Sequence, residues 1–433
     1  MRVAIVGSGI SGLVVAHHLA REHAIELYEA GGHVGGHTHT HQLELGGRTL
    51  AVDTGFIVFN RKTYPNFCRL LEELGVASKE SDMSFSVREE RTGIEWNGRN
   101  LDTVYAQRTN LLRPSFHRMV LDILRFNREA LELLAGEDEI PLGDFLRERR
   151  YSESFRRLYI LPMGAAIWSA SPDEMLAFPA RFFARFFHNH GFLQVEGRPM
   201  WRVVEGGSAR YVEALIRPFA ERVHVDTPVR SIRRLPDGVE LELPRGERQR
   251  FDQVVIATHS DTALALLADP SPAERSVLGA IRYQENEALL HTDARLLPRR
   301  RKVWASWNYH LLDPGGAAAG AQGADRLNPH RATLTYWMNR LQGLDCSEEL
   351  CVTLNHSQAV QPARVLRRMT YHHPHFDLPT VAAQGRHREV SGVNRTWYAG
   401  AYWRYGFHED GVMSGLRVVE GLTGRRVLVE PWA

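Results

Sequence analysis

The chain has 433 residues, of which 43% are hydrophobic and 24% charged, a composition typical of globular proteins with room for two or three domains. A formal charge of only +2, without a helix dense in Lys and Arg, argues against a nucleic-acid partner. Three scattered cysteines without a CxxC pair argue against a disulfide scaffold and favour a cytoplasmic protein. No run of about 18 apolar residues predicts a membrane span, but a peripheral contact at the inner face of the membrane stays open.

A dinucleotide-binding pattern opens the chain. The apolar periodicity predicts a strand, a helix and a second strand at residues 2–6, 13–20 and 25–28. Between the first strand and the helix, Gly7, Gly9 and Gly12 follow the GxGxxG spacing. Gly7 permits a tight turn, Gly9 lets the backbone approach a diphosphate, and Gly12 lets the helix pack on the strand. The helix N-terminus offers N–H groups to the phosphates, and Glu29 accepts hydrogen bonds from the adenosine ribose.

The rest of the chain predicts helical regions interrupted by short strands. Helical patterns occupy residues 64–74, 116–134, 141–150, 152–160, 211–219 and 411–422. Strand patterns occupy residues 223–225, 229–232, 239–243, 251–258 and 397–400. Residues 281–376 are rich in Trp, Tyr and His, which indicates a mixed sheet lining a cavity. The Gly/Ala-rich residues 314–324 predict a surface loop.

Further motifs carry a family resemblance. After GSGISG at 7–12 come GGHVGGH at 31–37, VDTG at 52–55, VEGGS at 204–208, VVIATH at 254–259 and YAGAYWRYGFHEDGVMSG at 398–415. In this order the chain resembles the amine-oxidase-like flavoproteins, and more closely a bacterial group of FAD-dependent oxidoreductases associated with cyclopropane fatty acid synthases. The segments similar to that group are LLHTD (289–293), ASWNYH (305–310), LTYWMNRLQ (334–342) and GFHEDG (406–411).

The resemblance covers essentially the whole chain and implies FAD as the cofactor. It implies an α/β fold in which a Rossmann-like FAD-binding domain is built from discontinuous segments, residues 1–80, 200–275 and 385–433. A substrate domain of α+β type, with a mixed sheet and helices, is inserted at residues 81–199 and 276–384. The cofactor-binding residues that it implies are Gly7, Ser8, Gly9, Ile10, Ser11, Gly12, Glu29, Ala30, Gly35, Gly36, His37, Gly55, Phe56, Val229, Ala257, Thr258, Gly400, Gly411, Val412 and Met413.

The histidine-rich stretch at 31–41 has two interpretations. The resemblance places Gly35 and Gly36 beside the FAD diphosphate, and His37 stands where many relatives have Arg. A neutral imidazole offers one donor instead of a guanidinium fork, so we expect the diphosphate contact to be weaker or to be made by other groups. His37, His39 and His41 could share one strand face as metal ligands, but no acid or thiol accompanies them. We therefore predict no metal and partly exposed, polar-face histidines.

Other positions take their roles from the resemblance. Asp53 and Gly55 would shape the loop under the flavin ring, although a plain turn after a strand explains them too. Val229 would bracket the adenine, or else simply pack in the core, and Gly400 would lead to the ribityl chain.

The last helix carries three of the implied contacts. Gly411, Val412 and Met413 would sit at its N-terminus and face the diphosphate or the flavin. Ala401 stands where many relatives have Asp, and either Glu409 or Asp410 is a candidate for the lost acceptor. The pair of His408 and Glu409 lies either beside the flavin or in a turn that it stabilises. No catalytic residue follows from the sequence.

Aromatic residues suggest where a substrate would bind. Phe182, Phe183, Phe186 and Phe187 fall on one side of a helix in the stretch 181–192, which predicts a core stripe, with a lipid tunnel or membrane-dipping face as the alternative. The basic residues 299–302 form a solvated turn or meet anionic lipid headgroups. The candidates for a cavity over the flavin are Trp304, Trp307, Tyr309, Tyr336, Trp337, Trp403 and Tyr405, several of which could be plain core residues.

These observations predict an FAD-dependent oxidoreductase that removes a hydride equivalent from a C–H bond. The resemblance implies an apolar, fatty-acyl or lipid-like substrate and a lipid-modifying enzyme as a partner. Two alternatives stay open, a flavin amine oxidase of the polyamine type and a flavin-binding partner without turnover. An acidic residue in the cavity would favour the amine oxidase, and a purely apolar cavity would count against it.

Overall fold

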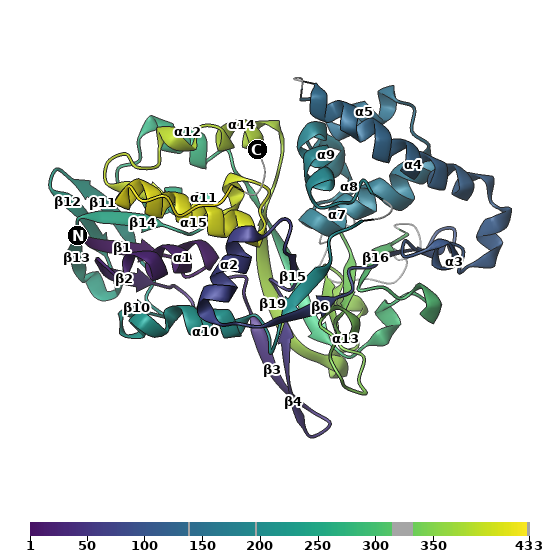
Figure 1. Ribbon diagram of the computed structural model, residues 1–433, viewed down its shortest axis with the longest axis horizontal. Coiled ribbons are helices and arrows are strands. Elements are labelled where there is room, and N and C mark those ends of the chain that lie inside the picture. Colours follow the sequence, from purple (N-terminus) through teal and green to yellow (C-terminus); the bar gives the residue numbers. More distant parts are fainter. Residues whose placement is uncertain (137–138, 195–196, 314–331, 431–433) are drawn as a thin grey trace.

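The computed structural model describes residues 1–136, 139–194, 197–313 and 332–430, so the predicted loop at 314–324 lies outside the described residues. One lobe contains a five-stranded parallel sheet, and the other contains a seven-stranded sheet covered by helices (Figure 1). Within the described ranges, no helix combines the length and the apolar character needed to cross a membrane. The fold is therefore of the mixed α/β class that the sequence predicts.

The parallel sheet has the strand order β10-β2-β1-β14-β20, with β1 (Arg2–Val6), β2 (Ala24–Tyr28), β10 (Val223–His224), β14 (Gln253–Ile256) and β20 (Thr396–Tyr398). Successive residues of a strand point to opposite faces, so Val3 and Ile5 enter one core while Ala4 and Val6 enter another. Burial on both faces explains the continuously apolar strand. All five strands come from the three segments predicted to bind FAD, whose exact boundaries stay predictions.

Helices cover both faces of this sheet. On the face of Val3, α1 (Ile10–Leu19) packs along α15 (His408–Thr423), beside α2 (Pro65–Leu74) and α10 (Ala209–Ile216). On the other face lie α11 (Ser260–Leu266), α12 (Pro272–Leu278), α14 (Leu378–Gln384) and the antiparallel strands β11 (Ser231–Leu235), β12 (Gly238–Glu242) and β13 (Arg248–Phe251). As predicted, Gly75 ends α2 in the left-handed conformation.

The prediction of one strand over residues 251–258 is wrong. The chain leaves one sheet at Phe251, the end of β13, and enters the parallel sheet at Gln253. Asp252 lies between them. Its backbone N–H donates to the carbonyl oxygen of Arg2 (2.9 Å), and its carboxylate accepts from the backbone N–H of Arg2 (2.7 Å). Val229 likewise precedes β11 rather than belonging to it.

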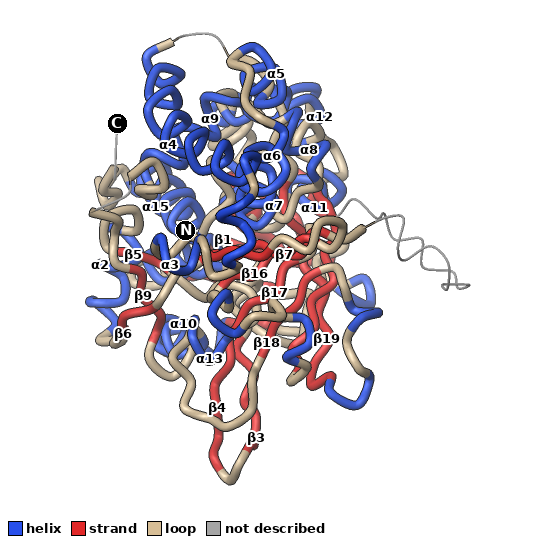
Figure 2. The backbone as a smooth tube through the Cα atoms, turned by 90° about the vertical axis from the view of Figure 1, so that its right-hand side faces the viewer, coloured by secondary structure: helices blue, strands red, loops and turns tan. Residues whose placement is uncertain are grey.

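The seven-stranded sheet has the order β19-β15-β18-β17-β16-β7-β8, and all its pairs are antiparallel except β16 with β7. Its strands are β7 (Phe85–Glu89), β8 (Glu95–Asn97), β15 (Tyr283–His291), β16 (Trp307–Leu311), β17 (Leu334–Trp337), β18 (Cys351–Leu354) and β19 (Val365–Pro374). Figure 2 shows the helices gathered above it: α4 (Pro114–Ala135), α5 (Leu142–Glu148), α6 (Glu153–Phe155), α7 (Leu161–Trp168), α8 (Pro172–Ala177) and α9 (Ala180–Asn189).

Shorter elements complete the fold. The helix predicted over 152–160 is α6 followed by a π-helical turn, Arg156–Ile160, that continues into α7. The remaining strands are β3 (Thr40–Leu45), β4 (Arg48–Asp53), β5 (Phe59–Asn60), β6 (Ser78–Ser81) and β9 (Trp201–Val204), and the remaining α-helices are α3 (Leu101–Val104) and α13 (Met338–Leu341).

Candidate active site

Glycine shapes the turn between β1 and α1. Gly7 has a φ of +103°, and a Cβ on Gly12 would collide with the carbonyl oxygen of Gly7, so α1 packs directly on the turn. Gly9 precedes α1 without a side-chain cap, which leaves N–H groups of the first helical turn free. A Cβ on Gly9 would meet no protein atom within 4 Å. The open space and the free N–H groups together make an anion-binding position.

Glu29 is held against this turn at the end of β2. Its Oε2 accepts hydrogen bonds from the backbone N–H (3.0 Å) and the hydroxyl (2.5 Å) of Ser8, and its Oε1 accepts from the N–H of Gly31 (2.8 Å). The parallel pairing of Val6 with Tyr28 places the turn and the carboxylate at the same sheet edge. An oriented carboxylate beside a free helix N-terminus fits the ribose and diphosphate of a dinucleotide.

A second glycine loop lies next to the first. The N–H of Gly35 donates to the carbonyl of Ser8 (3.1 Å), and a Cβ on Gly36 would come within 3.0 Å of the Cα of Gly9. Both loops therefore present backbone rather than side chains to the same space. The residues present fit a flavin dinucleotide, because only such a surface lets phosphate groups approach closely.

A cavity of about 540 Å³ opens from these loops. Its wall also contains residues 54–58, residues 257–259 after β14, the end of β19 and residues 400–402 and 405–408. All the predicted cofactor-binding residues line it except Gly12, Gly411, Val412 and Met413. The fold thus brings motifs from both ends of the chain to one cavity, and the contact of each residue with FAD stays a prediction.

The predicted start of the last helix is wrong. Helix α15 begins at His408, three residues before Gly411, so Gly411, Val412 and Met413 lie inside it rather than at its N-terminus. Gly411 packs on α1, where its carbonyl accepts a hydrogen bond from the Ser11 hydroxyl (2.9 Å) and an added Cβ would lie 2.6 Å from Ile10 Cγ2. This glycine therefore lets two helices approach each other.

Neither Glu409 nor Asp410 reaches the cavity wall. The carboxylate of Glu409 accepts hydrogen bonds from Asn66 N (2.9 Å), Asn66 Nδ2 (2.7 Å) and Phe67 N (2.9 Å), and so joins α15 to α2. Asp410 accepts from the N–H of Phe407 (2.9 Å). Burial raises the pKa of Glu409 to about 7 and that of Asp410 to about 6. The expectation that one of them replaces the acceptor missing at Ala401 finds no support in their positions.

His408 does line the cavity. Its ring stacks on that of Phe56, with centroids 3.6 Å apart, and its Nε2 lies 2.9 Å from the hydroxyl of Tyr211. The Tyr211 hydroxyl also lies 2.5 Å from Thr38 Oγ1. Burial lowers the pKa of His408 to about 3, so the imidazole is neutral. The sequence places the His408–Glu409 pair either beside the flavin or in a turn. The structure places His408, but not Glu409, in the cavity wall.

Asp53 lies behind the cavity wall and supports it through hydrogen bonds. It is fully buried outside the wall, where it accepts hydrogen bonds from Ser208 N (3.0 Å), Gln342 Nε2 (2.8 Å) and Thr40 Oγ1 (2.5 Å). Burial raises its pKa to about 6 despite these donors. Asp53 therefore connects β4 to two distant segments and supports the loop of Gly55, which lines the wall.

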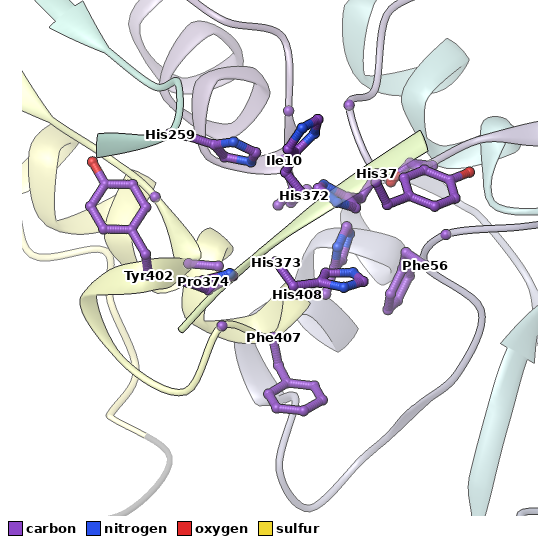
Figure 3. A pocket seen from close by; sticks show the side chains of 18 of the residues that line it. Ile10, His37, Phe56, His259, His372, His373, Pro374, Tyr402, Phe407 and His408 are labelled. Atoms are coloured by element: carbon purple, nitrogen blue, oxygen red, sulfur yellow. The ribbon is translucent and has the colours of Figure 1, made fainter. Parts of the chain in front are cut away.

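Four further histidines face the cavity: His37, His259, His372 and His373 (Figure 3). The ring of His37 lies 6.0 Å from that of His259 and 5.5 Å from that of His373, centroid to centroid, and its Nε2 is buried without a hydrogen-bond partner. Burial is the main cause that lowers the pKa of His37 well below its usual range, and the charge of His373 is the second cause. Burial also lowers the pKa of His259, and it lowers the pKa of His373 to about 4. These three imidazoles are neutral near pH 7.

The other histidines of the 31–41 stretch do not face this group. His39 lies between His33 and His41, with ring centroids 4.3 Å and 4.1 Å away. Over the described part of the chain, no set of three or more His, Cys, Asp or Glu side chains is placed to hold a metal ion.

Aromatic side chains form much of the remaining wall. Of the seven candidates, Trp307, Tyr336 and Tyr405 line the cavity, whereas Trp304, Tyr309, Trp337 and Trp403 do not. The sequence pattern missed several wall residues: Trp168, Trp201, Tyr371, Phe376, Tyr402 and Phe407. Tyr371 and Phe376 lie in the aromatic region 281–376, and Tyr402 and Phe407 lie in the motif at 398–415, but these patterns do not specify which rings reach the cavity, because the packing of distant strands and helices determines that.

The phenylalanine-rich stretch is part of the core. On α9, Phe183, Phe186 and Phe187 are buried, and Phe182 packs on the cavity residues Phe376 and Tyr405, with centroids 5.3 Å and 4.5 Å away. The core interpretation of this stretch is confirmed, and the membrane-dipping face at this helix is wrong. Residues 299–302 form a turn in which the N–H groups of the first two arginines bond to Glu95.

Comparison with known proteins agrees with this site. Residues 10–291 match the family described as flavin containing amine oxidoreductase. The fold is similar to cyclohexylamine oxidase from Brevibacterium oxydans IH-35A (TM-score 0.69, 16% identity, 97% of this chain and 98% of that chain). It is also similar to a putrescine oxidase (0.66, 15%, 98% and 100%) and to a CLA-producing fatty acid isomerase from P. acnes (0.68, 15%, 98% and 98%). No curated protein matches the chain.

Proposed function

The chain belongs to the flavin containing amine oxidoreductase family and is an FAD-dependent oxidoreductase, and from that premise we propose that its substrate is a fatty-acyl or similar lipid chain. In this proposal the enzyme removes a hydride equivalent from a C–H bond and so desaturates or oxidises the chain. The motifs shared with the group associated with cyclopropane fatty acid synthases support an acyl chain that is methyl-branched or carried on a phospholipid. They also support a lipid-modifying enzyme as a partner.

The polarity of the cavity wall carries this proposal. Among the described residues that line the cavity, Glu29 is the only carboxylate, and no Lys or Arg is present. Both oxygens of Glu29 are already bonded, to Ser8 and Gly31. An amine cation would be desolvated here without a counter-charge, whereas an acyl chain would bury only apolar surface. The wall therefore favours the lipid over the polyamine-type substrate.

In this proposal the protein positions the substrate and excludes water from the reacting groups. Bound FAD supplies the hydride acceptor. The wall contains rigid aromatic rings that would confine a flexible chain and exclude water: Phe376, Tyr405 and Phe407, with Trp307 and Tyr336 from the seven-stranded sheet. A reacting carbon must be held near van der Waals contact with its acceptor, and this confinement provides that.

Anaerobic reduction of the purified yellow protein tests the proposal. We expect an extracted phospholipid fraction or a long-chain fatty acid to bleach the flavin absorbance, while putrescine and cyclohexylamine leave it unchanged. Bleaching by the amines alone would overturn the lipid assignment in favour of an amine oxidase. If dithionite reduces the flavin but neither lipids nor amines do, the protein would instead be a flavin-binding partner without turnover.

A further inference from the structure

Exposed leucines concentrate in one part of the helical lobe. Of the twelve large hydrophobic residues that are exposed in the described chain, six lie between residues 101 and 131: Leu101, Leu111, Leu112, Leu121, Leu124 and Leu131. Single exposed leucines are ordinary, but half of the total within one short stretch forms a patch. In Figure 1 this stretch, α3 and α4, lies at the end of the molecule away from the parallel sheet.

The leucines of α4 form a stripe on its outer face. Positions 117, 121, 124, 128 and 131 repeat at intervals of four and three residues, so they share one side of the helix. The opposite side packs on the lobe through Phe116, Met119, Phe126 and Ala130. At about 1.5 Å per residue the stripe is roughly 20 Å long. Leu121 is 61% exposed, so this side of a well-packed helix presents apolar side chains to solvent, with His117 and Arg128 as the polar members of the stripe.

The preceding 3-10 helix, Arg108–Leu112, extends the stripe. His117, at the start of the stripe, has its Nε2 2.9 Å from the carbonyl oxygen of Leu111, which fixes this short helix beside α4. Leu112 is 86% exposed, the highest value for a large hydrophobic residue in the described chain. We name the surface formed by Leu111, Leu112, Leu121, Leu124 and Leu131 the leucine face.

Exposed positive charge exceeds exposed negative charge along the stretch that carries the leucine face. The exposed charged side chains between residues 99 and 132 are four arginines (Arg99, Arg108, Arg118 and Arg128) and two carboxylates (Asp102 and Glu132). Asp102 pairs with both Lys302 (2.5 Å) and Arg108 (2.7 Å), Glu132 pairs with Arg149 (3.1 Å), and Arg118 pairs with the buried Asp122 (3.3 Å). Of the four arginines, Arg99 and Arg128 have no ion pair among the described residues, so the leucine face is apolar with free positive charge beside it.

We propose that the leucine face docks on an anionic phospholipid bilayer. The leucines would enter the acyl boundary while the arginines meet the phosphate groups of the headgroups. Arg128, in the middle of the stripe, fits this arrangement because its long stem lies along apolar surface while its guanidinium stays at the headgroups. The proposal concerns a surface outside the cavity and does not depend on the identity of the substrate.

A second copy of the chain is a poorer occupant. In a symmetric dimer the same cationic surface would face itself, so Arg128 and its neighbours would repel. A partner helix along the stripe would bury the charge of Arg128 at the centre of the contact. Charge complementarity thus favours the bilayer, and self-association becomes an outcome of the test.

Vesicle co-sedimentation of the full-length holoprotein tests this docking. We expect binding to vesicles of phosphatidylcholine and phosphatidylglycerol in equal parts, weaker binding to pure phosphatidylcholine, and loss of binding at high salt. Leu121→Glu with Leu124→Glu should weaken binding at least about tenfold, because two apolar side chains become charged. The matched control, Leu378→Glu with Val393→Glu, changes two other exposed apolar residues and should bind as the wild type does.

Flavin content and the melting temperature show whether each variant is folded, and Leu112→Glu, in the short 3-10 helix, repeats the test outside α4. Absent binding by the wild type, or equal binding by the Leu121→Glu/Leu124→Glu variant, overturns the proposal. A wild type that sediments as a dimer and a variant that is monomeric, with vesicle binding unchanged, would assign the leucine face to self-association instead.

Discussion

The imidazole of His408 lies parallel to the ring of Phe56, with centroids 3.6 Å apart and an angle of 8° between the planes. This stack joins the first residue of α15 to the loop after β4, so two segments far apart in the sequence form one piece of cavity wall. The Nε2 atom of the same imidazole lies 2.9 Å from the Tyr211 hydroxyl, which fixes the orientation of the ring.

His408→Leu should lower the affinity for FAD, because it removes a flat wall element, whereas Tyr211→Phe should preserve it. Loss of the Tyr211 hydroxyl removes two buried hydrogen bonds, to His408 and to Thr38, and should cost about 2 kcal/mol of unfolding free energy. Fluorescence titration of the apoprotein with FAD and urea unfolding measure the two effects. If both variants bind FAD as the wild type does, the stack has no part in the cofactor site.

The glycines of the β1–α1 turn should separate folding from cofactor binding. Gly9→Ala places a Cβ in open space, so the protein should fold with a nearly unchanged melting temperature but purify without yellow colour. Gly12→Ala places its Cβ against the Gly7 carbonyl and should destabilise the fold itself. A yellow Gly9→Ala protein with wild-type FAD content would contradict a diphosphate at this turn.

FAD binding should take up protons. Burial holds the pKa of His37 and His259 below the usual value and that of His373 at about 4, so these imidazoles are neutral in the free protein at pH 7. A dianionic diphosphate nearby would favour their charged forms and raise these pKa values. Affinity should therefore increase as the pH falls from about 8 to 6.

Calorimetry in buffers of different ionisation enthalpy measures this proton uptake. Riboflavin, which lacks the diphosphate, is the matched ligand and should bind without it. His37→Arg should bind FAD more tightly and with a shallower pH dependence, since its charge is fixed. Equal proton uptake with FAD and riboflavin would assign the effect to another part of the protein.

Asp53→Asn should destabilise the fold by about 2 kcal/mol, because an amide nitrogen would face donors such as Ser208 N or Gln342 Nε2. The pKa of Asp53 is raised to about 6 in the folded state, above its usual value near 4, so the folded protein binds this proton more tightly than the unfolded chain does. The contribution of Asp53 to stability therefore falls as the pH rises from about 4 to 6.

Urea unfolding at several pH values checks this prediction, and the Asn variant should lack that component of the pH dependence. Glu44→Gln, on the exposed part of the neighbouring strand β3, is the control and should change the unfolding free energy little. Identical pH profiles for the wild type and Asp53→Asn would show that Asp53 does not titrate in this range.

Local sequence pattern predicted the nucleotide-binding end of the site well. The β1–α1–β2 unit, the role of Gly12 and the position of Glu29 depend on neighbours within the first 30 residues, and the observed strands match the predicted ranges to within one residue. The start of α15 was predicted three residues late, because Gly411 resembles a turn glycine while Asp410 in fact bonds to the N–H of Phe407 at the beginning of the helix.

The substrate side of the cavity could not be predicted in the same way. His372 and His373 reach the wall because β19 pairs with β15 in a register that places His373 opposite Gln284, and no local pattern specifies that register. His259 follows a predicted strand in the motif VVIATH, but that motif does not indicate that its ring lies near His37 on the cavity wall. The pattern at 116–134 predicts a helix but not the outward orientation of its leucines, because that depends on how the helix packs on the lobe.

Strand β20 (Thr396–Tyr398) completes the parallel sheet by pairing with β14, and Gly400 directly after it belongs to the cavity wall. Residues near the start of the chain and residues that follow them by almost 400 positions therefore form one cavity wall. A nascent chain halted before residue 396 would expose the bare edge of β14, with Val254, Val255 and Ile256, to other unfinished chains. Flavin capture should accordingly wait until β20 and Gly400 have been synthesised and paired with β14.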